Sequence, residues 1–325
     1  MKARNQPARI TLVALLTLVA ALTLAAPAAN SWPDRSIRII APAAGSPADI
    51  AARTIGEILS AKWRQPVIVE NRPGADNILA VQALLESRDG HTFLFVTHSA
   101  VTVNPLLHAK LPYSPADLAP ISLVVDDFLG IVSALATPAN SLAELVTFAR
   151  SKPGELNVYT VPGSPSLSWL ALQKRAGIST TFVPYRTPSA ALADLAEGRI
   201  HAAVIPLAFV RGALESKKIR LLAVTNASRS PVAPDAPTVA EAGFPEITFG
   251  GMLGLFGPKD MPLELRSRVA ADVKSAVAAP EVAERLRGAG LAVRGSTPEE
   301  FLAVLDQQRA HWDAIARDHN VQPRQ

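Results

Sequence analysis

The chain contains no cysteine among its 325 residues. Disulfide bonds, thiolate metal sites and a cysteine nucleophile are therefore excluded, and so is a lipoprotein anchored through a cysteine. Histidine is sparse, and no histidine lies at metal-ligand spacing from another histidine or a carboxylate, so no metal site is expected. The histidines are His91, His98, His108, His201, His311 and His319. Stability must come from the hydrophobic core, which 49% apolar residues can supply.

The chain also has almost no net positive charge once residues 1–28 are set aside. Residues 1–28 hold Lys2, Arg4 and Arg9 but no acidic residue, so the remainder has 29 basic against 28 acidic residues, a net charge of +1. Nucleic-acid binding needs a basic surface and has no support here.

Residues 1–28 have the features of a cleaved export signal. A charged start precedes an apolar run, Ile10–Ala26, and Ala26-Pro27-Ala28 offers small residues at a cleavage site. We expect cleavage near Ala28. A retained membrane anchor is the alternative, but the run is shorter than the ~20 residues that a spanning helix needs.

The stretch Ser36–Lys62 predicts a strand, a tight turn and a helix in succession. Its turn holds the residues that typically begin a helix, namely Gly45, Ser46 as cap, Pro47 at the first helical position and Asp49 three residues after the cap. The same order recurs in Leu156–Lys174, with Gly163, Ser164 and Pro165, and more weakly in Phe182–Leu195. A strand that delivers the open N-terminus of a helix to a sheet edge favours anion binding there.

Alternating strands and helices predict an α/β fold with parallel, doubly wound sheets. The chain leaves a first lobe near residue 126 and returns near residue 250, and two crossings make a hinge with a cleft between two lobes. We expect lobe 1 to comprise residues 29–126 and 248–325, and lobe 2 residues 127–247. The predicted crossing strands are 121–125 and 247–256.

Polar residues at 97–99 follow the predicted strand 92–96, at the edge where open α/β sheets bind ligands. His98 and Ser164 would suit an exported hydrolase if their side chains met. However, residues 162–166 read P-G-S-P-S and do not form the G-x-S-x-G turn of a hydrolase nucleophile. Hydrolysis is therefore a minor alternative.

Eight segments, in order along the chain, resemble the extracytoplasmic solute receptors of tripartite tricarboxylate transporters, the Bug-type or TctC-like proteins. They are W-P-D-R-S-I-R-I-I-A-P (32–42), V-I-V-E-N-R-P-G-A (67–75), D-G-H-T (89–92), N-P-L-L-H-A-K-L-P-Y (104–113), V-P-Y-R (183–186), A-V-T (223–225), P-T-V-A-E-A-G (237–243) and S-T-P-E-E-F (296–301). The resemblance covers essentially the whole mature chain. It implies a monomeric periplasmic binding protein of the two-lobed, Venus-flytrap (type II-like) architecture with two crossing strands.

The resemblance also implies a function. Such receptors capture small organic carboxylates and deliver them to integral-membrane permease subunits, without cofactor or catalysis. A receptor of the same fold that presents its ligand to a sensor kinase is the alternative.

The ligand-binding residues implied by the resemblance lie in loops of both lobes. Lobe 1 would contribute Ala43, Ala44, Gly45, Ser46, Asp49, Thr97, His98, Ser99 and Asn104, and lobe 2 Thr160, Gly163, Ser164, Ser166, Ser168, Tyr185 and Arg186. For Asp49, a structural role in the helix cap is favoured over recognition of an amino or hydroxyl group. Arg186 is either a carboxylate partner or a solvated surface charge.

The loops also depart from the family pattern. Before the first helix, where P-x-G-G is usual, this chain reads P-A-A-G-S-P (42–47). Ser168 stands where a histidine is usual, Thr187-Pro188 where a glycine pair is common, and His201 at a common acidic position. Each change takes flexibility or a polar group from the pocket, which disfavours an ordinary dicarboxylate as ligand.

Overall fold

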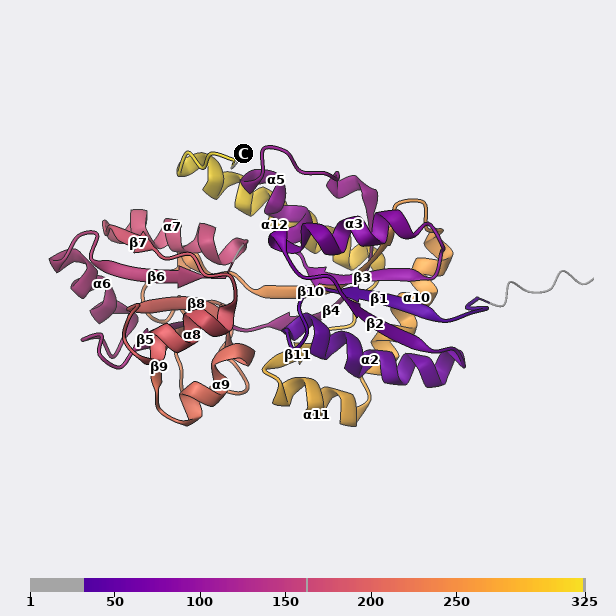
Figure 1. Ribbon diagram of the computed structural model, residues 1–325, viewed down its shortest axis with the longest axis horizontal. Coiled ribbons are helices and arrows are strands. Elements are labelled where there is room, and N and C mark those ends of the chain that lie inside the picture. Colours follow the sequence, from indigo (N-terminus) through magenta and orange to yellow (C-terminus); the bar gives the residue numbers. More distant parts are fainter. Residues whose placement is uncertain (1–31, 162, 324–325) are drawn as a thin grey trace, which may run out of the picture.

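The computed structural model describes residues 32–161 and 163–323 (Figure 1). The expected signal peptide, residues 1–28, lies outside the described residues, as does Pro162. The described chain forms two sheets, each with helices on both faces. We call the part built on the six-stranded sheet lobe 1 and the part built on the five-stranded sheet lobe 2. None of the helices in the described ranges is long and apolar enough to cross a membrane.

The sheet of lobe 1 has the strand order β11-β4-β10-β3-β1-β2. Its strands are β1 (Ile37–Ala41), β2 (Val67–Asn71), β3 (Thr92–Thr97), β4 (Leu118–Asp127), β10 (Gly251–Pro258) and β11 (Leu291–Val293). Helices α2 (Pro47–Trp63), α10 (Leu263–Val277) and α11 (Pro280–Gly288) cover one face. The other face is covered by α3 (Ile78–Ser87), α4 (Ser99–Thr102) and the first half of α12 (Pro298–Asp318).

The sheet of lobe 2 has the order β7-β6-β8-β5-β9. Its strands are β5 (Leu129–Ala134), β6 (Leu156–Thr160), β7 (Thr180–Phe182), β8 (Ala202–Pro206) and β9 (Ile219–Val224). Helices α6 (Leu142–Ser151) and α7 (Ser164–Ala176) pack on one face. Helices α8 (Pro188–Ala196) and α9 (Leu207–Glu215) pack on the other.

The expectation of parallel sheets is wrong in part, because both sheets are mixed. Only β1, β2 and β3 in lobe 1, and β6, β7 and β8 in lobe 2, run parallel. The return strand β10 pairs antiparallel with β3 and β4, and β5 pairs antiparallel with β8 and β9. The cause is the double crossing: β4 leaves lobe 1 and β10 re-enters beside it, so the two neighbours must run in opposite directions.

The strand directions determine which loops face the other lobe. Because β3 and β4 are both antiparallel to β10, and β1 is parallel to β3, the carboxyl ends of β1, β3 and β4 all lie at the edge of lobe 1 where β4 departs for lobe 2. In lobe 2, Leu129 at the start of β5 pairs with Pro206 at the end of β8, and β6 is parallel to β8. The carboxyl end of β6 therefore faces lobe 1. Figure 1 shows α2 and α7 both beginning at this boundary.

The local sequence explains α2, the helix that brings its N-terminus to the boundary. Its apolar residues Ile55, Leu59 and Trp63 recur every four positions and are buried beneath the strands of lobe 1. Burying a side chain such as Leu59 contributes roughly 1.5–3 kcal/mol. The helix ends where Arg64 adopts a left-handed conformation with φ 54°. An Ile55→Ala change would leave a cavity and cost about 2–5 kcal/mol.

Two segments of lobe 1 also pack into the core of lobe 2. Phe301, in the first turn of α12, belongs to a core cluster of lobe 1, whereas Trp312, three turns later, is fully buried in the cluster beneath α6 and α7. Val103 and Leu107, around α5 (Asn104–Leu107), join that cluster as well. The lobes are thus connected by α12 and α5 in addition to the two crossing strands.

Both predicted crossing strands have other bounds in the structure. The strand predicted at 121–125 extends over Leu118–Asp127. The predicted strand 247–256 begins at Gly251, since Pro245–Ile247 forms a 3₁₀ turn and pairing with β4 starts at the Gly251–Asp127 register. Strand β7 ends at Phe182, since it pairs with β6 only as far as Val158–Phe182. Pro184, two residues further on, cannot donate a ladder hydrogen bond.

Candidate functional site

The turn after β1 forms a closed hydrogen-bonded cap on α2. The Ser46 hydroxyl accepts a hydrogen bond from the Asp49 N–H at 3.2 Å. A capping box would have the Asp49 carboxylate accept from the N–H of Ser46, but Oδ2 instead accepts from the N–H of Gly45, one residue earlier, at 2.9 Å. Ala43, Ala44 and Gly45 are exposed, and the N–H groups of Ala43 and Ala44 have no acceptor within the described ranges.

Both carboxylate oxygens of Asp49 accept hydrogen bonds. Its Oδ1 accepts hydrogen bonds from Arg53 at 3.0 Å and from Asn71 at 2.8 Å. Burial acts to raise the pKa of Asp49, but the hydrogen bonds from Arg53, Asn71 and Gly45 outweigh it and hold the pKa below its usual value. The geometry supports the capping role of Asp49, and both oxygens are used within lobe 1.

The residues after β3 point in different directions. Thr97 accepts a hydrogen bond from the Ser99 N–H at 3.0 Å, which orders the turn into α4. Asn104 is buried and donates to the Asp76 carbonyl at 2.9 Å and to the Tyr113 hydroxyl at 3.1 Å, so its amide nitrogen holds neighbouring segments of lobe 1 together.

His98 is completely buried and does not hydrogen-bond to Ser164. Its Nδ1 lies 3.0 Å from the Thr102 hydroxyl, and its Nε2 has no partner within the described residues. Burial lowers the pKa of His98 to about 4, and the nearby Gly250 backbone opposes only part of that shift. The imidazole is therefore neutral near pH 7. The pair that a hydrolase would require is not formed.

The turn after β6 is built differently from its counterpart in lobe 1. Gly163, with φ 96°, is the residue before α7, and Ser164 is the first helical residue. The helix end has no side-chain cap and no acidic residue in its first turn. Thr160 and Ser166 hydrogen-bond to each other through their hydroxyls at 2.8 Å, and the buried Ser168 hydroxyl has no partner in the described chain.

The two lobes touch at this turn. The hydroxyl oxygens of Ser99 and Ser164 are 3.4 Å apart, and both side chains are buried. A Cβ atom on Gly163 would lie 3.0 Å from the Ser99 hydroxyl oxygen and 3.1 Å from the Ser99 Cβ. On the opposite flank, Arg211 in α9 donates to the carbonyl of Gly288 in α11. The structure therefore brings Ser99, Gly163 and Ser164 together across the boundary.

Tyr185 and Arg186 lie beyond β7 and differ from each other in environment. The Tyr185 hydroxyl donates to Asp194 at 2.5 Å, its ring packs edge-on against Tyr159, and burial and Asp194 raise its pKa to about 12. Arg186 is exposed and forms no ion pair with a residue in the described ranges.

A residue that sequence reasoning did not select, Asp127, lies at the same boundary. It is the last residue of β4, its side chain is buried, and its Oδ1 has no hydrogen-bond partner in the part of the chain that the structure describes. Burial alone raises its pKa to about 8. The available signal was an acidic residue ending an apolar strand where the chain changes lobes.

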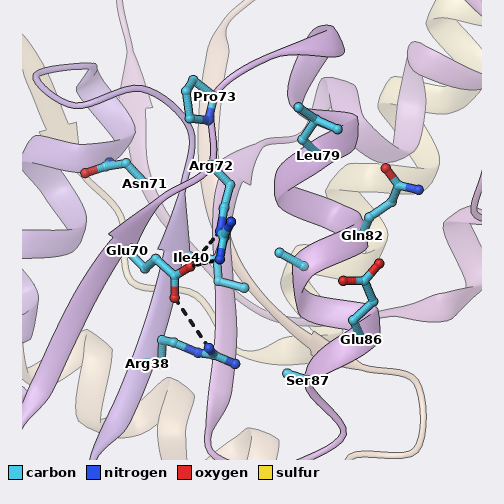
Figure 2. Close-up of a pocket in the computed structure, with 11 residues that line it drawn as sticks. Arg38, Ile40, Glu70, Asn71, Arg72, Pro73, Leu79, Gln82, Glu86 and Ser87 are labelled. Atoms are coloured by element: carbon cyan, nitrogen blue, oxygen red, sulfur yellow. Dashed lines mark hydrogen bonds and ion pairs between the residues drawn. The ribbon is translucent and has the colours of Figure 1, made fainter.

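Another opening of the molecule lies away from the boundary. A cavity of about 560 Å³ opens between β2 and α3 (Figure 2). Figure 2 shows Glu70 between Arg38 and Arg72, with ion-pair distances of 3.4 Å and 2.5 Å, while Gln82 and Glu86 project from α3. None of the predicted ligand-binding residues lines this cavity.

Two lobes joined by crossing strands, with helix N-termini at their common boundary, define the class of two-lobed solute-binding proteins. Comparison with known proteins agrees. The family model of the tripartite tricarboxylate transporter family receptor, TctC, matches residues 51–321. The chain belongs to this family, whose fold is that of periplasmic binding proteins and not of enzymes.

The chain is similar to individual family members over most of its length. Protein BugT of Bordetella pertussis is 27% identical over 89% of this chain and 91% of that protein. A Rhodopseudomonas palustris protein solved with adipate is 29% identical with a TM-score of 0.83, covering 90% of this chain and 100% of that chain. MatC from the same organism, with bound malate, is 27% identical with a TM-score of 0.77, covering 87% and 99%. The predicted Bug-type resemblance and two-lobed fold are confirmed.

Proposed function

We propose that this protein is a periplasmic receptor that captures a small organic carboxylate between its lobes and delivers it to the permease subunits of a tripartite tricarboxylate-type transporter. The observation that carries the proposal is the convergence of the turns after β1, β3 and β6 on one boundary, with Ser99 and Ser164 3.4 Å apart. The features of residues 1–28 support export, and the family supports the transporter as partner.

The chemistry of the boundary suits a carboxylate. The N-terminus of α7 offers the backbone N–H of Ser164 and the positive end of a helix dipole, without an acidic side chain in its first turn. Pro165 has no N–H, and the Ser166 N–H donates to the Gly163 carbonyl at 3.1 Å. Hydroxyl groups of Ser99, Ser164 and Ser166 lie beside it. Solved relatives bind adipate and malate, which are both dicarboxylates.

Magnitudes indicate that lobe closure contributes as well. A helix end stabilises a partly buried carboxylate by up to ~2 kcal/mol, so two ends supply at most about 4 kcal/mol. A micromolar Kd requires about 8 kcal/mol. The remainder must come from hydrogen bonds to hydroxyl groups and from burial of the ligand between the lobes.

Thermal-shift screening of the mature chain, residues 29–325, against mono-, di- and tricarboxylates tests the proposal. A ligand that binds only the folded form raises the melting temperature, by an amount equivalent to about 2.7 kcal/mol at a hundredfold excess over Kd. We expect at least one small carboxylate to do so, and Ser164→Ala to weaken it. The absence of any shift across the panel would contradict the proposal.

A further inference from the structure

Asp127 occupies the edge of lobe 1 where a ligand would be held. Its register partners are Gly251, the first residue of β10, and Leu291, the first residue of β11. It therefore lies at the carboxyl end of β4, at the same edge of the sheet as the carboxyl ends of β1 and β3, with β10 between β4 and β3. Open α/β sheets bind their ligands outside this edge. Asp127 is also the last residue before the chain enters lobe 2 through Phe128 and Leu129.

The carboxyl group of Asp127 has nothing to pair with. Its Oδ1 has no donor among the described residues, and burial is the only cause of its raised pKa, with no charge nearby to oppose it. The preceding residue, Asp126, is paired with Arg294 at 3.4 Å. Strands β10 and β11, on either side of β4, contain no charged residue. A buried polar group without a partner costs roughly 1–3 kcal/mol and requires an explanation.

The backbone around Asp127 is fixed on both sides of the crossing. Asn226 donates to the Asp127 carbonyl at 3.1 Å and accepts from the Leu129 N–H at 3.2 Å. A Cβ on Gly251 would lie 2.8 Å from the Asp127 carbonyl oxygen and 3.0 Å from its Cβ, so glycine permits this close approach. The unpaired carboxyl is thus held in place at the hinge.

Asp49, the other acidic residue at this boundary, cannot serve a cationic group. Both of its oxygens are engaged by Gly45, Arg53 and Asn71. Of these two acidic side chains, only Asp127 has an oxygen without a donor.

We propose that Asp127 binds the ammonium group of the ligand, and that the preferred ligands are therefore small carboxylates bearing an amino group. This inference rests on the proposed function. The helix ends and hydroxyl groups hold the carboxylate, while Asp127 loses its proton to solvent and forms an ion pair with the ammonium. A dicarboxylate without an amino group would leave Asp127 protonated and unpaired, so it would bind more weakly.

Matched ligand pairs test this inference by isothermal titration calorimetry of the mature chain. The pairs are succinate and aspartate, glutarate and glutamate, and adipate and 2-aminoadipate. We expect the amino form of the best pair to bind at least about tenfold more tightly to the wild-type protein, which corresponds to about 1.4 kcal/mol. Asp127→Asn should abolish this preference, whereas the matched control Asp126→Asn should retain it.

Proton release gives a readout that does not depend on a variant. Titrations of the wild-type protein at pH 7 in two buffers with different heats of ionisation should show release of about one proton per amino ligand bound, because Asp127 changes from protonated to ionised. The plain diacids should release none.

The possible outcomes separate this inference from the proposed function. Diacids that bind as tightly as their amino forms without proton release, or an Asp127→Asn variant that keeps the preference, would overturn the role of Asp127 alone. If no carboxylate of either kind binds the wild-type protein, the receptor proposal fails and this inference fails with it.

Discussion

The turns after β1 and β6 contain the same three residues, glycine, serine and proline, yet they begin their helices differently. In lobe 1, Ser46 precedes α2 and caps it, and the Asp49 carboxylate adds a negative charge to the helix end. In lobe 2, Gly163 precedes α7, Ser164 is already helical, and the first turn holds no acidic residue. The shift of one residue removes the side-chain cap, and the first turn of α7 holds no residue like Asp49, so the positive end of α7 is uncompensated. We therefore expect α7 to provide the stronger carboxylate contacts.

The largest expected effect on ligand affinity comes from adding a methyl group at Gly163, in the turn after β6. Gly163→Ala would impose on alanine a backbone conformation, φ 96° and ψ −140°, that is essentially restricted to glycine, at roughly 1–3 kcal/mol, and would also push its Cβ against Ser99 across the lobe boundary. We expect carboxylate affinity to fall at least about a hundredfold, an effect equivalent to about 2.8 kcal/mol. Calorimetric titration with the best ligand measures the loss.

Gly45→Ala is the matched control, because Gly45 has φ 72° but a Cβ there meets no atom within 4 Å. It should lower the unfolding free energy by a similar strain term while affecting affinity far less. Equal losses of affinity in both variants would show that the two turns do not differ as we describe.

Asp49→Asn should mainly lower stability. The change removes a buried carboxylate that accepts hydrogen bonds from Gly45, Arg53 and Asn71, so the unfolding free energy should fall by about 1–3 kcal/mol. Chemical denaturation at pH 7 measures this loss, and a variant as stable as the wild type would contradict it.

The contribution of Asp49 should also depend on pH in a defined direction. Because folding lowers its pKa, the stabilisation is complete above the unfolded-state pKa of about 3.9 and is lost as the pH falls through the lower folded-state pKa. The difference in stability between wild type and Asp49→Asn should therefore shrink on acidification below about pH 4. A difference that is constant with pH would assign the loss to packing.

Ser46 and Ser164 should differ in what their replacement by alanine affects, which is stability for Ser46 and ligand affinity for Ser164. Ser46→Ala removes a helix cap and should cost about 1 kcal/mol of stability with little change in affinity. Ser164→Ala removes no cap and should leave stability nearly unchanged, while weakening carboxylate binding several-fold. Denaturation and titration of both variants check this crossed pattern, and identical behaviour of the two would contradict it.

The smallest effect is expected at Arg186. Its side chain is exposed, so a contact with a ligand carboxylate is screened by solvent and contributes less than about 1 kcal/mol. Arg186→Ala should leave the melting temperature of the free protein unchanged and weaken binding no more than about fivefold. A complete loss of the ligand-induced thermal shift would instead make Arg186 a principal carboxylate partner.

Much of the fold could be predicted from local patterns. The cap residues at Ser46 and Thr297, and the apolar strands between them, place most helices and strands within a few residues of their observed bounds. Strand direction could be predicted only in part. The two crossings require β4 and β10 to run in opposite directions, but the alternation of strands and helices does not determine that β5 pairs antiparallel with β8 and β9. The start of β10 depends on its pairing with Asp127, which is a tertiary contact.

The site was predictable only in part, for a related reason. The glycine–serine–proline motif indicates a helix start, but it does not determine whether Ser46 or Ser164 precedes its helix or begins it. Asp127 is distinguished by the absence of a hydrogen-bond donor, which becomes visible only when the neighbouring strands are in place.

A crystal structure of the mature protein with the best carboxylate from the thermal-shift screen tests the central claim most directly. We expect the carboxylate between the lobes, within hydrogen-bond distance of the Ser164 backbone N–H at the start of α7. A ligand bound instead in the cavity between β2 and α3, or on the outer surface of either lobe, would contradict the account.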